Sequence, residues 1–112
     1  MKEYPLGEFE EIVLLTVGIL HGKAYGVAIK LEIEERLSRK VSVGALQTAL
    51  RRMDKKGYLT SKKGESSPER IGRPKLYFSL TAVGHKALSH ARDTRNTLWD
   101  AIPHASLQLK LS

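Results

Sequence analysis

Residues 42–59 of the chain read SVGALQTALRRMDKKGYL. Ser42 is of a type that caps helix N-termini, and Gly57 can take the left-handed backbone conformation that ends a helix. Between them, apolar residues recur at spacings of three and four, which predicts a helix with one narrow apolar face. That face consists of Val43, Leu46, Leu50 and Met53. We therefore expect a helix that runs to Lys56 and packs one side against other helices.

The opposite face of this helix changes character along its length. Small and hydrogen-bonding residues come first and cations follow, in the order Gly44, Ala45, Gln47, Thr48, Arg51, Arg52 and Lys55. Slim residues let a helix approach base edges in the major groove of DNA, where Gln and Thr can hydrogen-bond to bases. The later cations can bind phosphates. For an isolated helix, an ordinary solvated surface would be the better explanation of the same charges.

Two further helices are predicted before this stretch. Apolar spacing indicates one helix over residues 6–20 and another over residues 25–37. Glu8, Glu10 and Glu11 suit the positive end of the first helix dipole, which explains them without any catalytic role. With the helix of residues 42–56, these segments predict a compact three-helix unit.

The segments after Gly57 predict a hairpin and a last helix. Alternating residues indicate strands over 58–63 and 75–80, and the intervening stretch 64–74 has the Gly, Ser and Pro content of a hairpin tip. Thr81 can cap a final helix that runs to about residue 102. We therefore expect a mostly α (α+β) fold, a winged helix-turn-helix with a three-helix core, a two-stranded wing and a C-terminal helix.

This pattern predicts three parts along the chain. Residues 1–81 would form the winged helix DNA-binding domain, residues 82–103 a C-terminal dimerisation helix, and residues 104–112 a flexible tail. The sequence has no internal repeat and no linker that would mark another domain.

The hairpin carries a second group of cations. It directly follows the helix predicted for residues 42–56, which we call the reading helix because its outward face would contact bases. The cations of the hairpin are Lys62, Lys63, Arg70, Arg73 and Lys75. The tripeptide 72–74, Gly-Arg-Pro, suits an extended close approach to a sugar-phosphate backbone or minor groove. Taken alone, the tripeptide is explained equally well by a plain turn, and the Lys62–Lys63 pair by a solubilising strand edge. Together with the helix face, these cations indicate DNA.

The overall charge supports the same hypothesis and excludes several others. The chain of 112 residues has a net charge of +7, and its basic residues gather in the middle: residues 43–75 hold nine Lys/Arg against three Asp/Glu, whereas residues 1–37 hold four against seven. That segregation predicts a polyanionic partner for the middle segment. The absence of cysteine excludes disulfides, thiolate metal sites and cysteine nucleophiles, and fits a reducing compartment.

Other classes are disfavoured by missing motifs. We expect a cytoplasmic protein without a membrane-spanning segment, because no export signal is present and the longest apolar stretch, residues 12–20, is too short to cross a bilayer. The four histidines have no metal-ligand spacing, and no phosphate-cradling loop or nucleophile motif occurs. The sequence therefore predicts neither an enzyme nor a bound cofactor or metal.

The sequence resembles the PadR family of bacterial and archaeal winged-helix regulators, in particular short members that end after one C-terminal helix. The resemblance runs from about Leu6 to Trp99. It rests on Tyr25-Gly26, on residues 42–46 and 49–53 followed by 57–59, and on GRPKLYFSLT over residues 72–81 with Gly84 after it. The family usually has tyrosine and proline where this chain has Gln47 and Thr48. That difference concerns base preference and leaves the fold unaffected.

The resemblance implies a repressor that binds palindromic promoter DNA as a dimer, in some members released by a small ligand. The last helix supports a dimer independently, because it carries more apolar surface than a small core can cover: Val83, Ala87, Leu88, Ala91, Leu98, Trp99 and Ile102. About five buried side chains per protomer at about 1.5 kcal/mol each would contribute about 15 kcal/mol, which matches the roughly 4 to 15 kcal/mol cost of association.

Trp99 is the candidate residue for binding a small aromatic effector. A flat indole in a dimer groove could stack on a planar ring. An anchoring role in the dimer interface is the favoured alternative, because large aromatic residues usually serve packing.

Two other functions stay open from the sequence. The first is an effector-sensing or protein-interaction module whose winged helix binds DNA only weakly and without specificity, which Gln47, Thr48 and the acidic first third allow. The second is RNA binding, which the low aromatic content of 6% disfavours because base stacking needs exposed rings.

Overall fold

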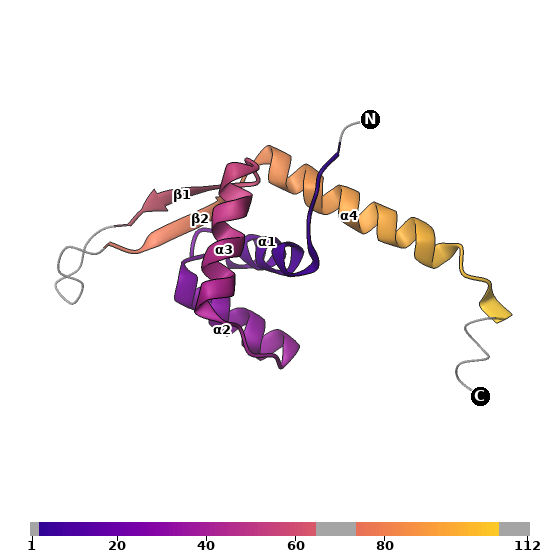
Figure 1. Ribbon diagram of the computed structural model, residues 1–112, viewed down its shortest axis with the longest axis horizontal. Coiled ribbons are helices and arrows are strands. Elements are labelled where there is room, and N and C mark those ends of the chain that lie inside the picture. Colours follow the sequence, from indigo (N-terminus) through magenta and orange to yellow (C-terminus); the bar gives the residue numbers. More distant parts are fainter. Residues whose placement is uncertain (1–2, 65–73, 106–112) are drawn as a thin grey trace.

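The computed structural model describes residues 3–64 and 74–105 and contains four helices and two strands over these ranges. In chain order they are α1 (Glu8–Leu20), α2 (Gly26–Leu37), α3 (Val43–Lys55), β1 (Leu59–Lys63), β2 (Leu76–Leu80) and α4 (Ala82–Asp100). Helices α1 to α3 gather into one body, the hairpin leaves it at one end, and α4 projects beyond it at the other (Figure 1). The predicted winged helix-turn-helix architecture is confirmed, with each boundary within two residues of its expected place.

The core lies where the three helices meet the base of the hairpin. Its largest fully buried side chains are Leu14, Ile29, Ile33, Met53, Leu59, Val13 and Val17. Phe78 from β2 and Ala87 from α4 extend the same core. Burial of each large apolar side chain contributes about 1.5 to 3 kcal/mol, and the buried Leu46, Leu50 and Met53 fix α3 against the body.

The ends of α3 follow the signals in its sequence. The Ser42 hydroxyl accepts a hydrogen bond from the Ala45 N–H at 3.0 Å, which satisfies one of the unpaired donors of the first turn. Gly57 has a φ of 78°, a conformation that costs glycine little and side chains much. The chain therefore leaves α3 sharply and enters β1 at Leu59.

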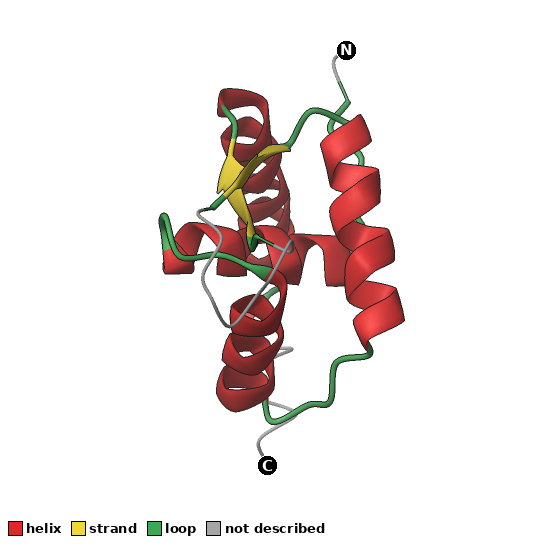
Figure 2. Ribbon diagram, turned by 90° about the vertical axis from the view of Figure 1, so that its left-hand side faces the viewer, coloured by secondary structure: helices red, strands yellow, loops and turns green. Residues whose placement is uncertain are grey.

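The wing sheet has a third contributor that the sequence did not indicate. Strands β1 and β2 are antiparallel, with Leu59 opposite Leu80 and Lys63 opposite Leu76. The Phe78 N–H donates to the Ala24 carbonyl at 2.8 Å, and Tyr25 forms an isolated bridge with Tyr77. The segment before α2 is thereby tied to the hairpin. Viewed from the hairpin end, the strands form a narrow ribbon in front of the helices (Figure 2).

The start of α4 is locked against the turn after α3. The Thr81 hydroxyl accepts from the Gly84 N–H at 3.0 Å and donates to the Gly57 carbonyl. A Cβ at Gly84 would lie 2.0 Å from the Tyr58 carbonyl oxygen, so only glycine fits there. The direction in which α4 leaves the body is set by this contact.

One detail of the expected core was wrong. Val43 was expected on the apolar face of α3 but is 60% exposed, and Ala49 is buried instead. Val43 occupies the first position of the helix, where the helix has not yet reached the packed body. Leu76 is also exposed, because it stands at the end of β2 furthest from the core.

Candidate nucleic-acid interface

The structure leaves the outward face of α3 open to solvent. Thr48 is partly covered, and the other members of the face are exposed: Gly44, Ala45, Gln47, Arg51, Arg52 and Lys55. The small residues lie in the first two turns and the cations in the last two. The face thus presents a slim end and a positively charged end along one helix.

One flank of this face is bounded by the beginning of α1. A hollow of about 400 Å³ separates Gly7, Phe9 and Glu10 from Gly44, Ala45, Thr48, Ala49 and Arg52. Thr48 lines this hollow and is partly exposed. The proximity of an acidic helix start to the reading helix is a tertiary feature that no local pattern in the sequence indicated.

Glu10 is engaged by the fold rather than free beside α3. Its carboxylate accepts from the Gly7 N–H at 2.8 Å and from the Lys56 ammonium at 3.0 Å. Burial opposes ionisation, but these two donors outweigh it and lower the pKa of Glu10 below its ordinary value. Lys56 also donates to the Pro5 carbonyl at 3.2 Å. Lys56 therefore ties the chain before α1 to the end of α3.

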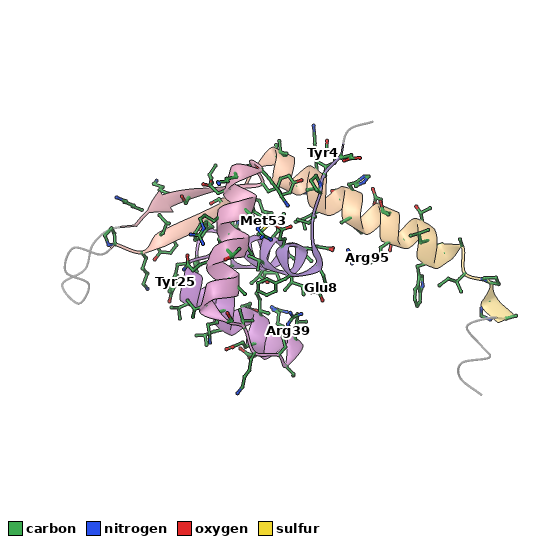
Figure 3. All side chains as sticks on the ribbon, viewed as in Figure 1. Tyr4, Glu8, Tyr25, Arg39, Met53 and Arg95 are labelled. Carbon is green, nitrogen blue, oxygen red and sulfur yellow. The ribbon has the colours of Figure 1, made fainter. Side chains whose placement is uncertain are left out.

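Nearby groups reinforce the same tie. The Tyr58 hydroxyl donates to the Pro5 carbonyl at 3.1 Å, and burial together with the charge of Glu10 raises the pKa of Tyr58. Glu8 pairs with Arg39 at 3.5 Å, and Figure 3 shows these two side chains on facing segments. The acidic first turn of α1 is thus matched by cations from other elements.

The cations of the hairpin differ from one another in environment. Lys62 and Lys63 are exposed on β1. Lys75 is half-buried, and its ammonium lies 4.0 Å from the centre of the Tyr25 ring. Arg70 and Arg73 lie outside the described residues. Within the described part of the wing, Lys62 and Lys63 are therefore the exposed cations.

The apolar residues of α4 divide into two groups. Ala87 is fully buried and Leu88 packs against the core of the same chain. The expectation that both face a partner is therefore wrong for Ala87, which contacts its own protomer. Leu98 and Trp99 are 67% and 62% exposed, Val83 and Ile102 are exposed to a lesser extent, and Ala91 is partly buried.

Helix α1 adds exposed apolar residues that the sequence did not assign to any surface. Leu15 and Ile19 are 47% and 51% exposed, one turn apart. Leu15 lines a hollow between α1 and α4 together with Leu88 and Arg95, and Arg95 forms an ion pair with Glu11 across it. The guanidinium of Arg95 has its pKa raised by that contact. The exposed Leu15 of α1 and the partly buried Leu88 of α4 therefore meet at this hollow.

Residues 3–64 and 74–105 hold no group of three or more His, Cys, Asp or Glu side chains placed to bind a metal ion. Among the helices of this part of the chain, none is long and apolar enough to cross a membrane.

These features define a winged helix-turn-helix protein, in which a three-helix core presents its third helix beside a hairpin. The chain belongs to the transcriptional regulator PadR-like family, whose sequence model matches residues 14–90. The expected family is thereby confirmed, and with it the expectation that the chain is a regulator and not an enzyme. A search among curated proteins finds no match.

Solved structures agree with the family assignment. A PadR-like transcription factor from Bacteroides fragilis is 26% identical, with a TM-score of 0.71 over 87% of this chain and 88% of that one. A PadR family regulator from Clostridium difficile R20291 is 28% identical, with a TM-score of 0.63 over 81% and 93%. Bacillus subtilis PadR, solved in complex with operator DNA, shares the fold at 18% identity and a TM-score of 0.62, over 77% of this chain and 47% of its own.

Proposed function

We propose that the protein binds a specific pseudo-palindromic operator in double-stranded DNA as a homodimer and represses transcription by occluding a promoter. The observation that carries this proposal is the solvent-open face of α3, slim at its start and cationic at its end, next to the exposed Lys62 and Lys63 of the wing. The operator complex of Bacillus subtilis PadR, which has the same fold, supports the proposal.

The contacts divide by residue type. Gly44, Ala45, Gln47 and Thr48 would face base edges in the major groove, where amide and hydroxyl groups can read donor and acceptor patterns. Phosphates would be bound by the cations Arg51, Arg52, Lys55, Lys62, Lys63 and Lys75, with Arg70 and Arg73 reaching a phosphate or the minor groove. Phosphate contacts set the register and affinity, whereas base contacts set the sequence preference.

A homodimer fits the surface of α4 and α1. We propose that Leu98, Trp99 and Ile102 of one protomer cover apolar residues of the other, including the exposed Leu15 and Ile19 on α1. A twofold dimer would place two reading helices about 34 to 36 Å apart, which is one turn of DNA. In this arrangement residues 1–81 act as the DNA-binding unit and residues 82–103 as the dimerisation helix, and Trp99 is a candidate to stack on an aromatic effector.

The experiment that tests the proposal combines selection with salt titration. Duplexes selected from a random pool by the full chain should share a pseudo-palindrome, and affinity for them should fall with salt. If the dimer neutralises about eight phosphates, the slope of log affinity against log salt should be about −7. A slope near zero, or a selected pool without a common sequence, would contradict specific DNA binding. We also propose that the protein works in the cytoplasm, where regulators of a bacterial and archaeal family meet DNA.

A second candidate function is an interaction module with only weak, nonspecific DNA binding. The acidic start of α1 beside the reading helix favours it, because Glu8 and Glu10 lie at the flank where a phosphate backbone would pass. This alternative predicts micromolar or weaker binding to every duplex at physiological salt. The same selection experiment distinguishes the two functions.

A further inference from the structure

A groove of about 290 Å³ lies between the start of α2, the start of α3 and β2. Leu46 and Phe78 line it and are buried. Three large apolar side chains also line it and stay exposed: Val27 from α2, Val43 from α3 and Leu76 from β2. Exposed apolar residues of three different elements therefore converge on one concave place, which is the usual character of a small-molecule site.

Among residues 3–64 and 74–105, the charged side chains that line this groove are cations, namely Lys30 and Lys75. Lys30 is engaged by Glu34 at 3.1 Å. Lys75 lies over the Tyr25 ring, and among the ion pairs of residues 3–64 and 74–105 none includes it. A cation stacked on a ring face keeps N–H groups for an acceptor, so Lys75 can pair with an anion in the groove.

The beginning of α2 adds to the same positive potential. Gly26 and Val27 line the groove from the first turn of α2. That turn has no acidic residue and its N-cap Tyr25 makes no side-chain cap. By contrast, α3 is capped by Ser42 and α4 by Thr81. The positive end of the α2 dipole and the ammonium of Lys75 therefore both raise the electrostatic potential in the groove.

We propose that this groove binds a small amphipathic anion, consisting of a compact apolar body and one carboxylate. The apolar body lies among Val27, Val43 and Leu76, and the carboxylate pairs with Lys75. Apolar walls favour such a molecule over inorganic phosphate, because burial of apolar surface contributes in proportion to its area. The volume limits the body to one or two rings or a short chain.

The ligand would compete with DNA, and this part of the inference rests on the proposed function. Gln47 and Lys75 line the groove and also belong to the proposed DNA-binding surface. A carboxylate at Lys75 takes the place that a DNA phosphate would occupy, so ligand and duplex exclude one another. The groove would then act as a site of release that lies on the reading surface itself.

The first experiment locates the site with 1-naphthoate and its neutral analogue 1-naphthamide. Each is titrated into the full chain and followed by amide chemical shifts. We expect naphthoate to shift the amides of Gly26, Gln47 and Leu76 and to bind about tenfold more tightly than naphthamide, because one charge-assisted contact is worth about that ratio. Equal affinities of the two probes, or shifts confined to Leu98 and Trp99, would overturn the proposal.

Two matched variants test the apolar wall. Val27 and Leu31 are one turn apart on α2 and are 55% and 57% exposed, but only Val27 lines the groove. Val27→Gln should weaken naphthoate about tenfold through lost apolar contact, and Leu31→Gln should leave it unchanged. Lys75→Gln should remove the preference for naphthoate over naphthamide. If Val27→Gln and Leu31→Gln behave alike, the groove is not the site.

A displacement experiment with DNA distinguishes this inference from the proposed function. Naphthoate should displace a duplex carrying the selected sequence from the wild-type chain, and about tenfold more should be needed with Val27→Gln. A chain that binds the duplex while naphthoate leaves the groove unshifted overturns the inference and leaves the function standing. A chain that binds naphthoate in the groove but no duplex overturns the function and supports the ligand site.

Discussion

At the scale of single residues, the cations of the basic region do not share one role. Lys56 is held by Glu10 and the Pro5 carbonyl and serves the fold. Lys75 rests on the Tyr25 ring, and Arg52 stands open at the end of α3. A basic residue in the sequence is available to a polyanion only if the fold leaves its charge free. The tertiary contacts of each residue therefore have to be known first.

Thr48 and Arg52 should differ in how they affect DNA binding. Thr48→Ala should change which sequence is preferred, because in the proposed complex its hydroxyl faces bases, and each altered base contact costs about 1 to 3 kcal/mol. Arg52→Ala should weaken all duplexes alike, because phosphate contacts carry no sequence information. Affinities for the selected duplex and single-base variants provide the measurement. Uniform loss on every duplex for Thr48→Ala would show that Thr48 does not read bases.

Glu10 should make stability depend on acid pH. Its pKa in the folded chain is lowered from 4.5, so the stability it contributes is present above the unfolded value and is lost as pH falls through the folded value. Glu10→Gln should cost about 1 kcal/mol at neutral pH through the weakened Lys56 contact, and this difference should disappear in acid. Urea unfolding at a series of pH values measures it, with Glu35→Gln on the exposed side of α2 as the control. A difference that persists unchanged in acid would contradict the role of the ion pair.

At the scale of elements, the junction between α3, β1 and α4 determines how the parts of the molecule are oriented. Gly57 turns the chain out of α3, Thr81 bonds back to that turn, and Gly84 lets α4 lie against Tyr58. The hairpin is fixed separately through Ala24 and Phe78. The reading helix, the wing and the last helix are thus held by contacts between turns, which a change in one residue can disturb.

Gly84→Ala should destabilise the protein because its Cβ would lie 2.0 Å from the Tyr58 carbonyl oxygen. Backbone atoms must move to relieve that overlap, at a cost of about 1 to 3 kcal/mol. Gly26→Ala is the matched control, since its Cβ would meet nothing within 4 Å. The urea midpoints of the two variants are compared. An unchanged midpoint for Gly84→Ala would show that the junction accommodates the added methyl group without loss of stability.

At the scale of the whole molecule, the unpartnered surface is divided between two ends. The outer part of α4 projects beyond the three-helix body, as Figure 1 shows, and carries Leu98 and Trp99 in solvent. Leu15 and Ile19 of α1 are further exposed apolar residues. The cationic face of α3 and the wing make up the other functional surface. A dimer that covers the first surface leaves the second free for a duplex.

Leu15→Asp or Leu98→Asp should convert a dimer into monomers, because a carboxylate would be buried in an apolar interface. Leu37→Asp is a suitable control: Leu37 is 48% exposed, close to the 47% of Leu15, and lies at the end of α2. Sedimentation of the full chain at micromolar concentration measures the state. Dimers of Leu15→Asp and Leu98→Asp as stable as the wild type would place the interface elsewhere.

The helices and strands of this protein could be predicted from the sequence, because their signals are local. Apolar periodicity marks each helix, Ser42 and Thr81 cap helix starts, and Gly57 ends a helix. The sequence also placed the outward residues of α3 together, since a helix face follows from spacing alone. Only the tertiary structure decided that Val43 stays in solvent, that Ala87 belongs to its own core and that Ala24 bonds to Phe78. The partners Glu10 and Lys56 are 46 residues apart. Contacts of this kind depend on which helices pack together and in what orientation, and the apolar periodicity of a single helix does not specify that.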